Sequence, residues 1–162
     1  MNAARELLND KRKPIRVIYV STYIPQKCGI ATFTKDITNA INMLNPYALA
    51  EIMVVVRQNE SPNFPWEVKY KIEKENLSSY LEAAKYINNS CADVVMIELE
   101  FGIFGGLCGE YIIDFAKIIK KPIVITCHTI PEDPERYCGK VLKKLCPLVS
   151  GLVVMMKQSR KK

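Results

Sequence analysis

Residues 15–21 read IRVIYVS, a run of β-branched, aliphatic and aromatic residues that follows Pro14 and precedes the turn-rich stretch TYIPQKCG. A continuous apolar run of this length is typical of a strand that is buried on both faces of a sheet. After the turn, apolar side chains recur at a spacing of three and four, at Phe33, Ile37, Ile41 and Leu44. This spacing predicts an amphipathic helix that ends at Asn45 and Pro46.

The strand-then-helix unit recurs along the chain. Further strands are predicted at AEIMVVVR (50–57), EVKYKI (67–72), DVVMIELE (93–100), PIVITCHT (122–129) and SGLVVMM (150–156). Further helices are predicted over 77–87, 110–121 and 134–145. Strands that alternate with helices predict an α/β fold: a Rossmann-like, doubly wound parallel sheet of about six strands with helices on both faces. Right-handed crossovers then predict the strand order 3-2-1-4-5-6.

The composition fits one globular domain. The chain has 162 residues, of which 49% are hydrophobic and 25% are charged, and this excludes disordered, collagen-like and coiled-coil proteins. We expect the domain to span 15–156 between basic tails at 1–14 and 157–162. No window is apolar enough to span a membrane, and the start of the chain has no apolar export signal, so a cytoplasmic location is expected.

The formal net charge of +6 comes from the two ends of the chain. Residues 1–16 and 157–162 hold nine Lys and Arg side chains against two acids, and the part between them is close to neutral. A basic face on the domain, and with it nucleic-acid binding, is therefore not expected. Solvated tails are the simpler interpretation, although screened attraction to RNA or to an anionic lipid surface, at the inner face of the membrane, is the alternative.

The cysteines do not follow the spacing of a metal site or of a disulfide framework. No two lie within four positions of each other, no CxxC motif is present, and the chain has one histidine. We therefore expect no metal ion and expect reduced thiols, most of them acting as small buried apolar groups. The residues concerned are Cys28, Cys91, Cys108, Cys127, Cys138 and Cys146.

A ligand site is expected outside the carboxyl ends of the strands, at the switch between the first and fourth strands. The loop from Thr22 to Gly29 leads from the first strand into a helix N-terminus, where unpaired N–H groups and the helix dipole favour an anion such as phosphate. A lone Gly29 is not a G-x-G-x-x-G motif, and Arg57 stands where a ribose-binding acid would stand. Gly29 therefore serves either a phosphate or the turn alone.

The segment after the fourth predicted strand holds two acids and several glycines. Strand alternation places Glu98 and Glu100 on one side, with their carboxylates about 6.5–7 Å apart. Such a pair can perform acid–base catalysis at the separation of an inverting glycosidase, but two acids that meet solvent or Lys and Arg partners are the simpler interpretation. The glycines that follow can form an anion nest or merely turn the chain; they are Gly102, Gly105, Gly106 and Gly109.

His128 is the single histidine of the chain and ends the fifth predicted strand, in TCHTIPEDP. Lone histidines are more often structural than functional. This one is followed by Thr129 and a proline-punctuated loop at the carboxyl edge, which favours a hydrogen bond to a ligand.

Four segments together resemble the N-terminal half of family 4 retaining GT-B glycosyltransferases, most of all a bacterial and archaeal branch labelled mannosyltransferase. They are STYIPQKCGIATFTKDI (21–37), DVVMIELEFGIFGG (93–106), KKPIVITCHT (120–129) and SGLVVMM (150–156). The resemblance covers about 15–157, and PQKCGIATFT and EFGIFGG are its more specific parts.

The resemblance implies one half of a two-domain enzyme, in which the N-terminal domain holds the acceptor and the C-terminal domain holds most of the nucleotide-sugar donor. It implies that Cys28, Gly29 and Ile30 lie near the donor diphosphate, and that His128, as the catalytic residue, contacts the transferred sugar. It also implies an acceptor side lined by Glu98, Glu100, Phe101, Gly102, Gly105 and Gly106. A GDP- or UDP-hexose would be the donor and a glycan or lipid-linked molecule the acceptor, with no metal ion or further cofactor.

Two departures from the family pattern affect the expected activity. The family reads Gln-His-Glu-Phe-Gly where this chain reads Glu-Leu-Glu-Phe-Gly from Glu98, and five residues follow residue 157, where the donor domain would begin. We therefore expect a hexosyltransferase half, mannosyl in the branch it resembles, that is a poor catalyst without the cations that a donor domain supplies to the departing diphosphate. It would be a truncated product, an excised domain or a subunit completed by a separate donor-domain chain. The alternatives are a non-catalytic carbohydrate- or protein-binding module and, on fold analogy alone, a dinucleotide-dependent reductase.

Overall fold

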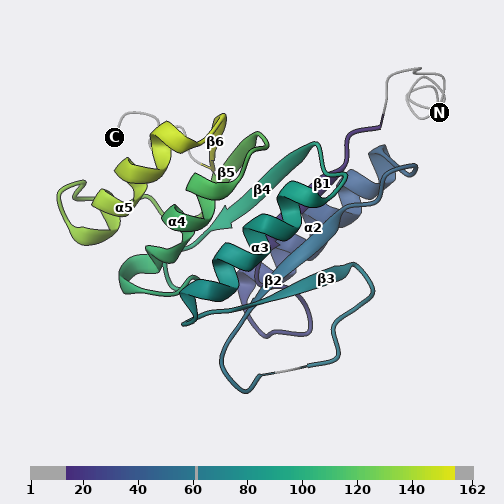
Figure 1. Ribbon diagram of the computed structural model, residues 1–162, viewed down its shortest axis with the longest axis horizontal. Helices are drawn as coiled ribbons and strands as arrows, with labels where there is room; N and C mark the ends of the chain where they lie inside the picture. The colour runs from purple at the N-terminus through teal and green to yellow at the C-terminus, as the bar shows by residue number, and fades with distance from the viewer. Residues whose placement is uncertain (1–13, 61, 156–162) are drawn as a thin grey trace.

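The computed structural model describes residues 14–60 and 62–155. In that part of the chain the strands form one six-stranded parallel sheet in the order β3-β2-β1-β4-β5-β6, as predicted from the sequence (Figure 1). The strands are β1 (Val17–Ser21), β2 (Glu51–Val56), β3 (Val68–Glu73), β4 (Val94–Leu99), β5 (Ile123–Cys127) and β6 (Gly151–Val154).

Helices connect most of the strands. They are α2 (Gly29–Leu44), α3 (Leu77–Asn89), α4 (Tyr111–Ile118) and α5 (Tyr137–Leu145), with the 3-10 turns η1 (Leu107–Gly109) and η2 (Cys146–Leu148). Polar caps begin the two longest helices: the Cys28 side chain accepts a hydrogen bond from the Ala31 N–H, and the Asn76 side chain accepts one from the Ser78 N–H.

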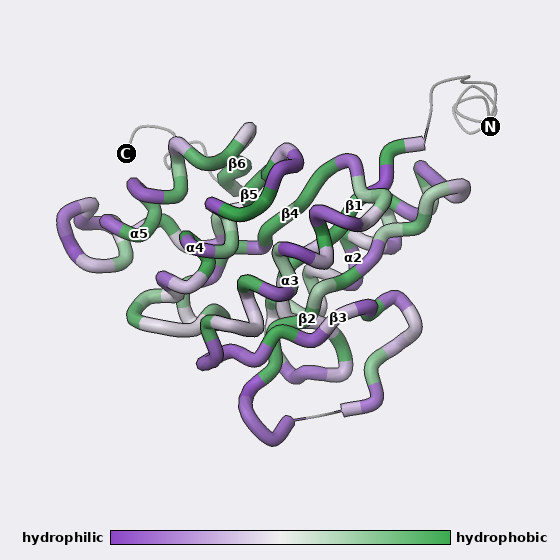
Figure 2. Tube along the Cα trace, in the orientation of Figure 1, coloured by the Kyte–Doolittle hydropathy of each residue, from purple (hydrophilic) through white to green (hydrophobic). Residues whose placement is uncertain are grey.

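The helices cover the two faces of the sheet unequally. The chain winds outward from β1 to β3 and then returns past β1 to β4, so right-handed crossovers place α2 on one face and α3, α4 and α5 on the other. Figure 1 shows the latter three helices in front of the sheet, and Figure 2 shows apolar strands beneath them. Tyr19 and Ile52 pack with α2 side chains, whereas Ile18 and Val95 belong to the larger core under α3, α4 and α5.

Two predicted helix boundaries were wrong, and local hydrogen bonds explain why. Helix α4 ends at Ile118 rather than at residue 121, because the Asn88 side chain binds the backbone there. Its amide nitrogen donates to the Ile118 carbonyl at 2.8 Å, and its amide oxygen accepts a hydrogen bond from the Lys120 N–H at 2.8 Å. Helix α5 begins at residue 137 rather than 134, because the Asp133 carboxylate accepts a hydrogen bond from the Glu135 N–H at 2.8 Å and forms a turn there.

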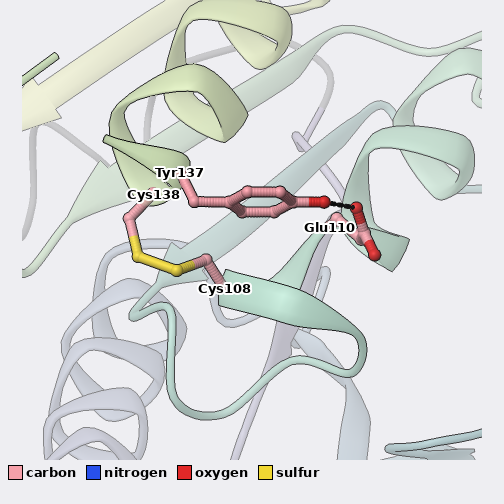
Figure 3. Close-up of a disulfide and its surroundings, with 4 residues drawn as sticks. All are labelled: Cys108, Glu110, Tyr137 and Cys138. Atoms are coloured by element: carbon pink, nitrogen blue, oxygen red, sulfur yellow. Dashed lines mark hydrogen bonds between the residues drawn. A yellow bond between two sulfur atoms is a disulfide. The ribbon is translucent and has the colours of Figure 1, made fainter. Parts of the chain in front are cut away.

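The prediction that the cysteines are reduced and mostly buried was also wrong. Cys108 of η1 and Cys138 of α5 form a disulfide, with their Cα atoms 5.1 Å apart (Figure 3). Of the unpaired cysteines that the structure describes, Cys127 is buried, and the other three are exposed: Cys28, Cys91 and Cys146. The pairing spans 30 residues of sequence, so it depends on how η1 and α5 meet in space rather than on a local motif.

The predicted basic tails lie mostly outside the described residues. Within 14–60 and 62–155, no helix combines the length and apolar character needed to cross a bilayer. The same residues contain no cluster of three or more His, Cys, Asp or Glu side chains that could hold a metal ion.

Candidate functional site

A cavity of about 570 Å³ opens at the carboxyl edge of the sheet, between the loops that follow β1, β2, β3 and β4. We call it the carboxyl-edge cavity. It lies beside the junction of β1 and β4, where the strand order reverses direction, and its volume is in the range of small-molecule sites. It is lined by Thr22, Gln26, Lys27, Cys28, Val55, Val56, Arg57, Glu60, Pro62, Lys74, Gly102 and Ile103.

The loop after β1 is held in place by the side chain of Gln26. Its amide oxygen accepts a hydrogen bond from the Tyr23 N–H at 2.9 Å, and its amide nitrogen donates to the Val55 carbonyl of β2 at 2.9 Å. Cys28 then caps α2, and its sulfur also lies 3.2 Å from the Thr22 hydroxyl. These bonds fix the N-terminus of α2 at the rim of the cavity.

Gly29 and Ile30 form the first turn of α2, so their N–H groups have no acceptor within the helix. A Cβ atom on Gly29 would meet no atom within 4 Å, and its backbone does not occupy the left-handed region. The turn therefore does not require glycine at this position.

The glycine-rich segment after β4 divides into two parts. Gly102 borders the cavity, and a Cβ atom there would meet nothing within 4 Å. At Gly105, by contrast, a Cβ atom would lie 1.6 Å from the Lys74 carbonyl oxygen. The Gly105 N–H donates to the Tyr80 hydroxyl at 2.9 Å, and the Gly106 N–H donates to the Glu75 carboxylate at 3.2 Å. This second part packs the loop against α3, so its amides serve the turn rather than an anion nest.

The two acids of β4 have different surroundings. Glu98 is fully buried, and its Oε2 atom lies 2.9 Å from Nε2 of His128. The interpretation that both acids meet solvent or Lys and Arg partners was therefore wrong for Glu98. Glu100 is partly exposed and accepts a hydrogen bond from the Thr129 hydroxyl at 2.6 Å.

Burial governs the ionisation of the Glu98 carboxyl. It raises the pKa of the Glu98 carboxyl above its ordinary value, and the hydrogen bond with His128 offsets that rise in part. Burial and the nearby Glu98 together raise the pKa of Tyr19 to about 12. The contact between Glu98 and His128 holds the imidazole ring in position at the carboxyl end of the β4–β5 pair.

His128 is also in contact with the helix that begins at the cavity rim. Its ring meets the Phe33 ring of α2 edge to face, with the centroids 4.8 Å apart, and its backbone N–H donates to the Leu99 carbonyl at 3.0 Å. The structure therefore brings His128, Glu100 and the first turns of α2 to one edge of the sheet. Among the sequence-predicted site residues, Cys28 and Gly102 line the cavity.

Two residues of the Glu-Leu-Glu-Phe-Gly segment belong to the core. Leu99 is fully buried under α3 and α4, and Phe101 is buried in the same cluster. Leu99 therefore contributes to core packing and does not border the cavity.

The cations of the cavity are not among the site residues predicted from the sequence. Lys27 lies in the loop after β1, Arg57 directly follows β2, and Lys74 directly follows β3. The signal was available, since a charged residue at the first position after a parallel strand lies at the edge where ligands bind. In the sequence, Arg57 indicates only that no ribose-binding acid follows the second strand.

Comparison with known proteins identifies the fold of this chain but assigns it to no family. No protein-family model matches the chain, and no curated protein matches it in sequence. Among solved structures, an alpha-glucosyltransferase in complex with UDP and a 13-mer DNA containing an HMU base has the same fold, with a TM-score of 0.56 and 13% sequence identity. The match covers 88% of this chain and 38% of the glucosyltransferase chain. The chain therefore has a glycosyltransferase-like, Rossmann-type α/β fold and spans well under half the length of that neighbour.

Proposed function

We propose that this chain is the acceptor-side domain of a hexosyltransferase that uses a nucleotide-sugar donor and acts on a glycan or lipid-linked acceptor. The carboxyl-edge cavity carries the proposal, because it lies at the switch point of a fold shared with a nucleotide-bound glucosyltransferase. The sequence resemblance to family 4 enzymes, and to their mannosyltransferase branch, supports the same assignment.

In this proposal the groups at the carboxyl edge of the sheet have separate roles in binding. The open first turn of α2 offers the N–H groups of Gly29 and Ile30 to the donor diphosphate, with help from the positive end of the helix dipole. His128, fixed by Glu98 and Phe33, contacts the transferred sugar. The acceptor enters the cavity between Cys28 and Gly102.

The test is hexosyl transfer from UDP- and GDP-hexoses, measured with the chain alone and with a donor-domain chain added. We expect transfer only in the completed pair, because the cations that stabilise the departing diphosphate belong to the donor domain. His128→Ala should lower the rate of the pair about a hundredfold. Absence of transfer with every donor and donor-domain chain, by a protein that remains folded, would refute the proposal.

A non-catalytic binding module is the second candidate. One observation favours it: the loops of this domain line a cavity in the volume range of small-molecule sites, where a ligand can contact side chains from four loops. Saturable sugar binding that is unaffected by His128→Ala, together with no transfer in any complex, would select this candidate over the first.

A further inference from the structure

Exposed apolar side chains gather at the amino edge of the sheet, where its parallel strands begin. Each of them lies in a segment just before a strand or in the last turns of a helix that runs back to this edge. We call this set the amino-edge patch. Single exposed apolar side chains are normal, whereas a group of them marks an interaction surface. The patch holds seven of the thirteen large hydrophobic side chains that are exposed in the described residues: Ile15, Met43, Leu44, Tyr47, Leu49, Trp66 and Tyr86.

Local contacts join the members of the patch into one surface. The Asn45 side chain, at the end of α2, donates to the Ile15 carbonyl at 2.6 Å, so the end of this helix lies beside the start of β1 (Figure 1). Leu49 and Tyr86 line opposite parts of one hollow of about 360 Å³. Because β2 and β3 are parallel neighbours, Trp66, just before β3, lies next to the loop before β2.

Exposed cations surround the patch. Arg16 follows Ile15 in the chain, Lys85 lies in the last turns of α3, and Lys120 lies in the loop before β5. The Lys69 ammonium lies 5.1 Å from the centre of the Trp66 ring. Within residues 14–60 and 62–155, no carboxylate forms an ion pair with Arg16, Lys85 or Lys120. Their charges are therefore available to an external anion.

The opposite edge of the sheet has the opposite charge. In the described part of the chain, the loops that follow β1 to β5 hold more acids than cations, and the loop after β5 alone holds Glu132, Asp133 and Glu135. In the sequence, residues 11–13 are Lys-Arg-Lys and come directly before Pro14, which leads toward β1. An anionic surface thus attracts the amino edge and repels the carboxyl edge. The near-zero net charge of 17–156 conceals this separation, so a basic edge was not expected from the sequence.

The composition of the patch fits a lipid surface. The rings of Tyr47, Trp66 and Tyr86 combine an apolar body with a polar tip, which suits the headgroup region of a bilayer. Lysine and arginine side chains can lay their apolar stems along such a surface while their charged ends stay in water.

We propose that the amino-edge patch docks on an anionic lipid surface, with its apolar side chains between the lipid headgroups and the surrounding cations against them. This inference is independent of the proposed function. The two edges are opposite ends of the same strands, so docking in this way turns the carboxyl-edge cavity away from the lipid.

The first experiment measures binding of the whole chain to vesicles by co-sedimentation. The probes are vesicles of phosphatidylcholine alone and vesicles that also contain phosphatidylserine. We expect saturable binding to the anionic vesicles only, and added salt should weaken it. Trp66 is the single tryptophan of the chain, so its fluorescence reports on the patch. Its emission should shift to shorter wavelength on binding and should be quenched by lipids with brominated tails.

Matched variants test the apolar side chains and the cations separately. The double variant Met43→Ser, Tyr47→Ser changes side chains that are 84% and 77% exposed, and it should weaken binding about tenfold. Leu107→Ser, a similar change at the carboxyl edge, should leave binding unchanged. Lys120→Gln should weaken binding about fivefold at low salt, whereas Lys140→Gln, in the first turn of α5, should not. All these side chains are exposed, so each variant is expected to fold, and thermal unfolding checks this.

Several outcomes would overturn the inference. The first is no binding to the anionic vesicles. Binding that leaves Trp66 unquenched, or that the double variant weakens no more than Leu107→Ser does, would assign the contact to the basic tails instead. An RNA oligonucleotide that displaces the vesicles would make this edge a nucleic-acid surface, and self-association that the double variant abolishes would make a second copy the occupant. Either result would refute lipid docking.

Discussion

Glu98 is the residue whose surroundings depart furthest from what its type suggests. A glutamate side chain is usually exposed, yet this one is fully buried and lies against His128. The Thr126 hydroxyl also donates to its carboxyl group, at 3.5 Å. Desolvation disfavours its ionised form, and the partners do not fully compensate, so the pKa of the carboxyl stays raised. Fixing His128 therefore has a cost in stability, which is typical of groups held for function.

We expect Glu98→Gln to stabilise the protein at pH 8 by on the order of 1 kcal/mol. A carboxyl whose pKa is raised on folding contributes stability below its unfolded pKa, and this contribution is lost as the pH rises through its folded pKa. Glutamine is neutral at every pH and so keeps that contribution. The advantage of the variant should vanish in acid, near pH 4. Urea unfolding of both proteins across this range measures it, and a less stable variant at pH 8 would instead indicate a net favourable ion pair.

Gly105 and Gly102 differ in the space that their neighbours leave, although both were predicted as acceptor-side residues. Gly105→Ala should destabilise the fold by about 3 kcal/mol or more, because the new Cβ atom would overlap the Lys74 carbonyl and force the backbone apart. Gly102→Ala, the matched control, should change stability by less than about 0.5 kcal/mol, since that position is open. Equal losses in thermal unfolding would contradict the packing role assigned to Gly105.

At the scale of elements, the connection between η1 and α5 is stabilised by more than packing. The disulfide from Cys108 to Cys138 joins them, and the Tyr137 hydroxyl donates to the Glu110 carboxylate beside it (Figure 3). Cys108 itself has a φ of 53°, in the left-handed region that is costly for a residue with a Cβ atom. The covalent link therefore holds a turn that the local sequence does not favour.

Removal of this disulfide should lower the free energy of unfolding by about 3–4 kcal/mol, the loop-closure value for a separation of this length. Cys138→Ser and reduction of the wild type should have similar effects, and the variant should not respond to reductant. Cys91→Ser, at an exposed unpaired cysteine, is the control and should remain near the wild type. Thiol titration of the unfolded, unreduced chain should find four free thiols, and six would show that the pair does not form.

At the scale of the molecule, the sheet is best covered at its centre and least at β6. β1 pairs with strands on both sides and is buried along its length, whereas β6 pairs with β5 alone, and its Leu152 and Val153 are exposed. Local opening is easiest where few buried contacts must break.

Amide hydrogen exchange should therefore show a gradient across the sheet. Peptides that contain β1 and β4 should exchange at least about tenfold more slowly than the peptide that contains β6, because opening at the edge requires less of the core to separate. Mass spectrometry of the native chain measures this gradient. Equal protection of β6 and β1 would mean that the edge strand is covered in solution.

Prediction from sequence succeeded where the signal was periodic and failed where it depended on distant partners. Hydrophobic spacing located the strands, because the burial of each strand is reflected in the apolar character of its own residues. Crossover handedness then gave the order of the strands in the sheet. The ends of α4 and the burial of Glu98 could not be predicted in this way. Asn88 on another helix ends α4, and His128 of the next strand's loop is the partner of Glu98.

The amino-acid pattern alone determined that this chain forms a doubly wound parallel sheet with loops gathered at one edge, because burial of apolar strands is a local property that repeats along the sequence. Tertiary structure alone decided which groups meet at that edge: the Glu98–His128 contact, the Cys108–Cys138 link and the three cations of the cavity. Such encounters join residues tens of positions apart, and their geometry exists only after the strands have been set side by side.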